Sequence, residues 1–257
     1  MVFDAEEGVQ AQSETVWRQA DHYNVPRICF LNKMDKLGAD FDASIDMIAD
    51  RLGAKLAIIT LPIGKEQSFR GIVDVIKKKA YIWQGAELGK NAEEIPVPED
   101  LKERLSQTRI ALLELVAGED EILMEKYLRD EKISQLELIA AIRRLTIANK
   151  VVPIFCGASL RNKAIQPLID GIVNFLPSPL DIPPVVGTNP IKGGKIKREP
   201  KNSAPFCALI FKIQTDPHMG KLTYLRLYSG QLKSGTSVLN AATRNSERIG
   251  RLLLMHA

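Results

Sequence analysis

The sequence predicts an α/β protein in which a parallel sheet is interrupted by an inserted α+β segment and followed by antiparallel strands. Apolar runs typical of buried strands alternate with helical spacing over residues 1–55, and this alternation resumes at 149–180. Between these stretches, strands come first and three helices follow. From Ala204 onward, apolar residues recur at every second position between glycine-containing turns, which is typical of antiparallel sheets.

The first stretch predicts a β-α-β-α order. Its expected elements are a strand over 2–4, a helix ending before Asn24 with Val16, Trp17, Ala20 and Tyr23 at helical spacing, a strand over 25–31 and a helix over 44–52. Such alternation implies a parallel sheet covered by helices, and ligands of these sheets bind beyond the carboxyl ends of the strands.

The middle stretch, about 56–148, has a different pattern. Its expected elements are strands over 56–62 and 69–76, a third strand with Tyr81 and Trp83, a polar stretch over 85–100, and helices through 101–116, 122–128 and 134–145. Ser134 and Glu137 form a capping box at the start of the last helix. We expect Trp17 and Trp83 to be packing residues rather than platforms for RNA bases.

The last part returns to the sheet pattern and then leaves it. We expect a strand over 151–156, the loop Gly157-Ala158-Ser159, a helix over 165–176, a proline-rich linker and a loop over 191–203. Four strands over 206–213, 222–228, 236–239 and 248–254 then predict an antiparallel barrel that is unfinished at Ala257.

The most specific motif is Asn32-Lys33-Met34-Asp35, directly after the strand over 25–31. An Asp carboxylate accepts two hydrogen bonds from the ring N–H and the exocyclic amine of guanine, and adenine offers no such pair. Sites built on such bonds reject analogues lacking the donors by roughly 10⁴-fold or more. Lys33 supplies an aliphatic stem to lie over the base, Asn32 can tie the loop to neighbouring backbone, and Met34 packs. The alternative is an ordinary polar turn with Lys33 in solvent.

No G-x-x-x-x-G-K-[ST] phosphate loop occurs in the sequence, and no D-x-x-G precedes the guanine motif. Gly64-Lys65 and Gly194-Lys195 lack the first Gly and the following Ser or Thr. We therefore expect the chain to be the middle of a longer protein. The alternative is a non-hydrolysing module that starts at Met1.

Composition sets mild limits. The net charge of +4 permits an RNA-rich partner without arguing for one, and no stretch approaches the roughly 20 apolar residues of a membrane span. Cys29, Cys156 and Cys207 lie in apolar runs, which favours buried free thiols. The three histidines lack metal-ligand spacing, so we expect no metal site in this chain. We also expect no catalytic residue, because the sequence has no phosphate loop.

Several motifs in order resemble elongation factor G, the GTPase that translocates tRNA and mRNA on the ribosome. They are VFDAEEGVQAQSETVWRQAD, VPRICFLNKMDKLGADF, LPIG, FRGIVDV, CGASLRNKAIQPLID and NFLPSPLDIPP, with GKLTYLRLYSGQLKSGTSVLN and RIGRLLLMHA resembling the following barrel. The resemblance implies an N-terminally truncated P-loop-GTPase-type parallel sheet over 1–55 and 149–180. It assigns 56–148 to an inserted subdomain and 181–257 to a linker and the start of an incomplete barrel domain.

The resemblance also assigns ligands and partners. Guanine would contact Asn32, Lys33, Met34 and Asp35, together with backbone N–H groups at Ala158 and Ser159, where the family usually reads Ser-Ala. The cofactor is GTP, with Mg²⁺ in the longer parent, whose ligands this chain lacks. The chain alone is expected not to hydrolyse GTP. The expected partners are the ribosome, through its RNA and stalk protein, and indirectly the tRNA–mRNA complex.

The family leaves the exact role open. A ribosome-recycling or organellar paralogue is the alternative within the family, and a non-hydrolysing ribosome-binding module is the alternative of another class. The compartment is expected to be the bacterial cytoplasm or else the mitochondrial matrix or plastid. We expect a monomer without membrane contact. Because 56–148 contains no recognisable guanine or phosphate ligand, we expect nucleotide affinity to survive its removal, whereas ribosome-stimulated turnover should fall.

Overall fold

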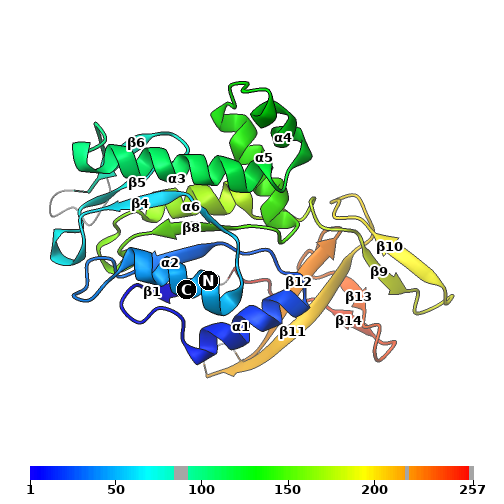
Figure 1. Cartoon of the computed structure of the whole chain (residues 1–257). Coiled ribbons are helices and arrows are strands. Elements are labelled where there is room, and N and C mark those ends of the chain that lie inside the picture. Colours follow the sequence, from blue (N-terminus) through cyan, green and yellow to red (C-terminus); the bar gives the residue numbers. More distant parts are fainter. Residues whose placement is uncertain (84–91, 218–219, 255–257) are drawn as a thin grey trace. The chain divides into compact units, whose positions relative to one another are not determined.

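The computed structural model describes residues 1–83, 92–217 and 220–254, shown in Figure 1. The chain divides into two compact units, Met1–Leu176 and Pro177–Ala257. The first holds a parallel sheet, a second sheet and the helices, whereas the second holds only antiparallel strand pairs among its described residues. The fold class expected from the sequence is confirmed.

The parallel sheet has the strand order β1-β2-β8-β3. Its strands are β1 (Val2–Asp4), β2 (Cys29–Asn32), β3 (Leu56–Ile58) and β8 (Val152–Cys156). The side chains of β8 are all buried, because strands inside a parallel sheet are covered on both faces and therefore read as continuous apolar runs. Asp4 pairs with Asn32, and Leu31 pairs with Cys156, so three carboxyl ends meet at one edge.

Three helices belong to this part of the chain: α1 (Ala11–His22), α2 (Phe41–Leu52) and α6 (Ile165–Phe175). The side chain of Asp40 caps α2 by accepting from the Ala43 N–H at 2.9 Å. In α1 only Trp17 is buried, beneath the guanidinium of Arg27 at 4.3 Å. The expected helix is confirmed, although two of the four apolar residues that predict it, Val16 and Tyr23, are exposed.

A second, antiparallel sheet lies in the chain between β3 and β8, in the order β4-β5-β6-β7. Its strands are β4 (Thr60–Ile63), β5 (Gly71–Asp74), β6 (Lys79–Ile82) and β7 (Glu93–Ile95). The single strand expected over 56–62 is wrong. Ile59 divides it: its N–H donates to the Ile154 carbonyl at 2.9 Å, and its carbonyl accepts from the Val75 N–H at 2.9 Å. One residue thus joins both sheets, which local periodicity does not reveal.

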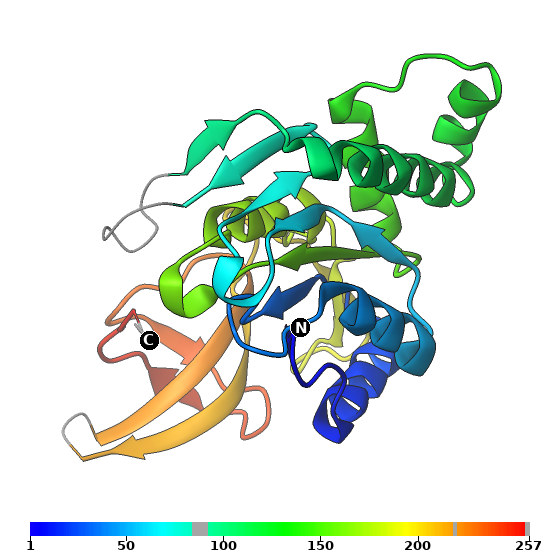
Figure 2. The ribbon, with the colours of Figure 1, turned by 60° about the vertical axis from the view of Figure 1, so that its left-hand side comes forward.

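Part of the expected polar stretch over 85–100 lies outside the described residues, and β7 and the start of the next helix occupy the rest. Helices α3 (Glu99–Ala117), α4 (Glu121–Leu128) and α5 (Gln135–Ile147) follow. They contact one another, and α5 also contacts α6 and β8. Figure 2 shows α3 as a long green helix close to the cyan strands of the second sheet.

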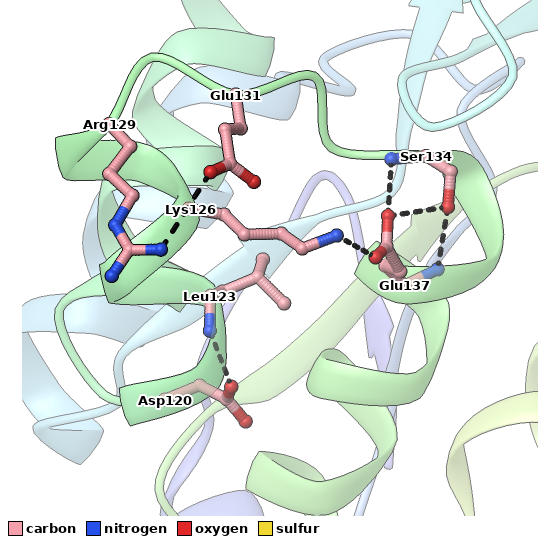
Figure 3. Close-up of polar contacts among 7 residues, drawn as sticks. All are labelled: Asp120, Leu123, Lys126, Arg129, Glu131, Ser134 and Glu137. Atoms are coloured by element: carbon pink, nitrogen blue, oxygen red, sulfur yellow. Dashed lines mark hydrogen bonds and ion pairs between the residues drawn. The ribbon is translucent and has the colours of Figure 1, made fainter.

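The N-terminal ends of α4 and α5 are capped by side chains (Figure 3). The predicted capping box is confirmed: Ser134 Oγ accepts from the Glu137 N–H at 3.3 Å, and Glu137 Oε2 accepts from the Ser134 N–H at 2.9 Å. Lys126 of α4 forms an ion pair with Glu137. This bond and those from Ser134 lower the pKa of Glu137 to about 2. Asp120 caps α4 at the Leu123 N–H, at 3.0 Å.

The first unit has one core that runs through both sheets and their helices. Buried residues of the parallel sheet, such as Leu31 and Ile154, belong to the same cluster as Ile72 of β5 and Ile142 of α5. The buried Arg109 of α3 donates to the carbonyls of Val75 and Ile76 at 2.8 and 3.0 Å. The segment between β3 and β8 is therefore packed into the same core. Trp83, as expected, is buried there.

The second unit consists of antiparallel pairs: β9 with β10, β11 with β12, and β13 with β14. The bounds are β9 (Val185–Thr188), β10 (Lys195–Arg198), β11 (Cys207–Asp216), β12 (Gly220–Ser229), β13 (Ser237–Leu239) and β14 (Ser246–Arg248). After β12, Gly230 has φ +74°, and a Cβ there would lie 2.7 Å from the Ala204 carbonyl oxygen. Only glycine fits this turn.

Two expectations for this unit are wrong. The loop expected over 191–203 contains β10. The strand forms through backbone pairing with β9, and its charged side chains do not indicate a strand in the sequence. The fourth strand lies at 246–248 instead of 248–254, because its register follows from pairing Arg248 with Ser237. Leu254 and its apolar neighbours are exposed and lie outside any described strand.

The thiols give a first prediction. Burial raises the pKa of both Cys29 and Cys156 to about 12, whereas Cys207 is half-buried. At pH 8 the two buried thiols stay protonated, and a thiol reagent attacks only the thiolate. Native protein should react with Ellman's reagent at Cys207 alone, and denatured protein at all three cysteines. Peptide mapping that finds rapid native labelling of Cys29 or Cys156 would contradict this.

A candidate guanine-binding site

The candidate site lies at the edge where β1, β2 and β8 end. Asn32 is the last residue of β2, and Gly157 follows the last residue of β8. The loop Lys33–Asp35 and the loop Gly157–Ser159 therefore start side by side, although 123 positions separate Asp35 from Ala158. Ligands of parallel α/β sheets bind at such edges.

Three hydrogen bonds join the loop Gly157–Ser159 to the end of β2 and to the loop Lys33–Asp35. Asn32 Oδ1 accepts from the Ser159 N–H at 2.9 Å, the Met34 N–H donates to Gly157 O at 3.1 Å, and the Gly157 N–H donates to Leu31 O at 2.9 Å. Asn32 thus ties the loop to neighbouring backbone, as the sequence predicts. Position 157 requires glycine, because a Cβ on Gly157 would lie 2.6 Å from the Lys163 carbonyl oxygen.

Lys33 is held by a residue that the motif does not include. Its Nζ donates to Asp4 Oδ2 at 2.6 Å, and its φ of +63° places it in the left-handed region. Partial burial disfavours ionisation of Asp4, but hydrogen bonds from Lys33 and the Glu6 N–H outweigh this and lower the pKa of Asp4. Met34 is 1% exposed, so only its backbone can face a ligand.

Asp35 keeps its carboxylate accessible. The side chain is 22% exposed, and its Oδ2 lies 3.0 Å from Arg161 Nε. A guanidinium presents N–H donors on one carbon, as the N1–H and exocyclic amine of guanine do. The Arg161 side chain is 69% exposed, so this ion pair is a weak one that a base can displace.

The loop after β8 uses its own N–H groups. The Ala158 N–H donates to the Lys163 carbonyl at 3.0 Å, and the Ser159 N–H donates to Asn32. Ala158 is buried and Ser159 is exposed. Contact between either N–H and the guanine oxygen therefore requires a shared, three-centre hydrogen bond.

Sequence reasoning did not identify four side chains that hold the site: Asp4, Glu66, Arg161 and Lys163. The position of Asp4 at the end of an expected strand was an available signal. Arg161 and Lys163 lie in the turn just after Ser159, but nothing local distinguishes them from solvated cations. Glu66 comes from a distant segment, so only the tertiary structure brings it near.

The side chains around the two loops do not form a metal centre. Within residues 1–83, 92–217 and 220–254, no group of three or more His, Cys, Asp or Glu side chains is arranged to hold a metal ion. Across the same described ranges, the helices are too short or too polar to span a bilayer.

Comparison with known proteins identifies the class of this domain and its family. Residues 1–178 match the elongation factor Tu GTP binding domain, and residues 205–257 match elongation factor G domain 2. The chain belongs to the translational GTPase family.

One similar solved structure is that of a protein from Thermus thermophilus. It is 30% identical, with a TM-score of 0.77. The match covers 96% of this chain and 33% of that one, so the chain spans a third of the length of that protein.

The bond between Asn32 and Ser159 gives a second prediction. Asn32→Ala removes the acceptor, so exchange of the Ser159 amide with deuterium should accelerate roughly fivefold, as expected for one net hydrogen bond of about 1 kcal/mol. Asn32→Asp keeps an acceptor oxygen and should accelerate exchange less. NMR-detected exchange measures both. Equal exchange in Asn32→Ala and the wild type would show that this bond does not hold the loop.

Proposed function

We propose that this chain is the guanine-recognising part of an elongation factor G, which couples GTP hydrolysis to the movement of tRNA and mRNA on the ribosome. The observation that carries the proposal is the accessible carboxylate of Asp35, at the carboxyl edge of the sheet, beside the loop after β8. The match of residues 205–257 to elongation factor G domain 2 supports this member of the family.

Guanine recognition follows from the donors and acceptors at this edge. The two oxygens of Asp35 accept from the N1–H and the exocyclic amine, and adenine would leave the carboxylate unpaired. Lys33 has the length to lay its stem over the base, while its Nζ stays on Asp4. Asn32 holds the loop with Ala158 and Ser159 in place for the guanine oxygen.

The proposed domain division assigns residues 1–55 and 149–180 to the GTPase domain, 56–148 to the inserted subdomain, and 181–257 to the linker and the start of the barrel domain. Because β3 (Leu56–Ile58) pairs with β8 in the parallel sheet, the insert is best counted from Thr60.

Phosphate binding, Mg²⁺ binding and hydrolysis are proposed for a longer parent protein. In that parent, Mg²⁺ would neutralise charge on the phosphates, and this chain would select the base. The proposed setting is the ribosome, reached through ribosomal RNA and the stalk protein as a monomer in the bacterial cytoplasm or an organelle. The basic segment from Lys192 to Lys201, which contains β10, supplies charge suited to RNA phosphates.

A third prediction concerns this chain by itself. With base contacts but no recognised phosphate loop, we expect GTP to bind at best at roughly millimolar Kd, which corresponds to about 4 kcal/mol of binding free energy. We also expect no phosphate release. Calorimetry and a phosphate assay measure these. Micromolar affinity would show that the chain contains phosphate ligands that the motif search does not recognise.

A fourth prediction tests Asp35 in the longer parent protein. Asp35→Asn replaces one acceptor by a donor that faces guanine's own donor, so GTP should bind at least about tenfold more weakly. XTP, with an oxygen in place of the amine, should bind more tightly than it does to the wild type. Asp46→Asn, a carboxylate on α2 away from the motif, is the matched control and should change neither. An unchanged preference for GTP over XTP in Asp35→Asn would exclude Asp35 from base contact.

A further inference from the structure

The segment Gly64–Phe69, between β4 and β5, contacts residues that follow each of the two loops of the candidate site. Glu66 Oε1 accepts from the Gly38 N–H at 2.9 Å, just beyond Asp35. The Phe69 carbonyl accepts from Lys163 Nζ at 2.7 Å, just beyond Ser159. One short segment of the insert therefore holds the two base-recognition loops from the outside.

A tight turn, hydrogen bonds within the segment and one buried side chain fix the conformation of Gly64–Phe69. Gly64 has φ +79°, and a Cβ there would lie 2.2 Å from the Ser68 carbonyl oxygen. Ser68 Oγ accepts from the Lys65 N–H at 3.0 Å and donates to the Lys65 carbonyl at 2.6 Å. The Phe69 side chain is 1% exposed and anchors the segment in the core.

The contact at Gly38 fixes the end of the guanine motif. The Lys36 N–H donates to the Lys33 carbonyl at 2.9 Å, which forms a turn around Asp35. Gly38 follows with φ +85°, and its N–H is the group that Glu66 accepts from. Loss of this contact would free the Gly38 N–H, three residues beyond Asp35, while the Asp40 N–H stays bonded to the Ala5 carbonyl.

The contact at Lys163 fixes the second loop. The N–H of Lys163 donates to the Ala158 carbonyl, and its carbonyl accepts from the Ala158 N–H, both at 3.0 Å. The Lys163 Nζ also lies 5.8 Å from the Phe69 ring centre. Burial lowers the pKa of Lys163, against the opposing effect of Asp35. The side chain is thus committed to the insert while its backbone closes the loop.

A third contact from the insert lies at the end of β8. The buried Thr60 of β4 accepts the Cys156 N–H on its Oγ1 at 2.9 Å, directly before Gly157. The insert therefore holds β8 at its end and both loops beyond the sheet.

We propose that Glu66 and Lys163 are positioning residues for guanine binding, through which the insert sets the spacing of the two base-recognition loops. The inference rests on the proposed function for the identity of the ligand. Displacement of the insert would then change guanine affinity. These contacts argue against the expectation that nucleotide affinity survives removal of 56–148, because that deletion removes Thr60, Glu66 and Phe69 together.

The test uses ¹⁵N NMR titration of the whole 257-residue chain with GDP, and with ADP as the control base. Glu66→Met and Lys163→Met each remove one contact and keep side-chain length. Each should raise the Kd for GDP roughly three- to tenfold, as for the net loss of one hydrogen bond, and should leave weak ADP binding unchanged. Glu66→Gln, which keeps an acceptor oxygen, should restore most of the affinity. Gln67→Met, at an exposed neighbour, is the matched control and should leave the Kd unchanged.

A ligand-free measurement separates this inference from the proposed function. Amide exchange at Met34 and Ser159, which bond across the two loops, should accelerate at least about threefold in Glu66→Met and Lys163→Met. If the wild type does not prefer GDP over ADP, the proposed function fails, and accelerated exchange would still support positioning. Unchanged Kd for GDP and unchanged exchange in both variants, at an unchanged unfolding temperature, would overturn the inference that Glu66 and Lys163 position the loops.

Discussion

The parallel pairing of β2 with β8 places every part of the candidate site. Phe30 pairs with Phe155 and Leu31 with Cys156, so both strands finish at the same edge. A shift of the register by one residue would move each side chain to the opposite face of the sheet and separate Asn32 from the loop that it holds. Burial on both faces makes such a shift costly, and the ends of the strands therefore fix the loops within hydrogen-bond distance.

The segment between β3 and β8 is part of this architecture. It follows one strand of the parallel sheet and precedes its neighbour, and its apolar residues join the same buried cluster. Ile59 gives its N–H to one sheet and its carbonyl to the other. Interiors this closely packed have discrete arrangements and resist gradual deformation. A partner that docks on the insert would thus have a physical route to the guanine loops through Thr60, Glu66 and Phe69.

Charge at the site is arranged in pairs of unequal strength. Lys33 and Asp4 form a close pair in which the carboxylate is largely shielded from solvent. Arg161 and Asp35 form a more exposed pair, whose attraction is weakened by water. The first pair therefore holds the loop, while the second leaves the Asp35 carboxylate open to a ligand with matching donors.

The sequence by itself determined the class of fold, the place of the Asn32–Asp35 motif at the end of a strand, the capping box at Ser134 and the burial of Trp17, Trp83 and two cysteines. These features depend on local composition and spacing, which the chain displays directly. Only the tertiary structure decided where the strand over 56–62 divides, that β10 forms, and that β14 lies at 246–248. Each depends on a backbone partner far along the chain. The same holds for Asp4, Glu66 and Lys163, because their roles come from distances across the fold and from no pattern in the sequence.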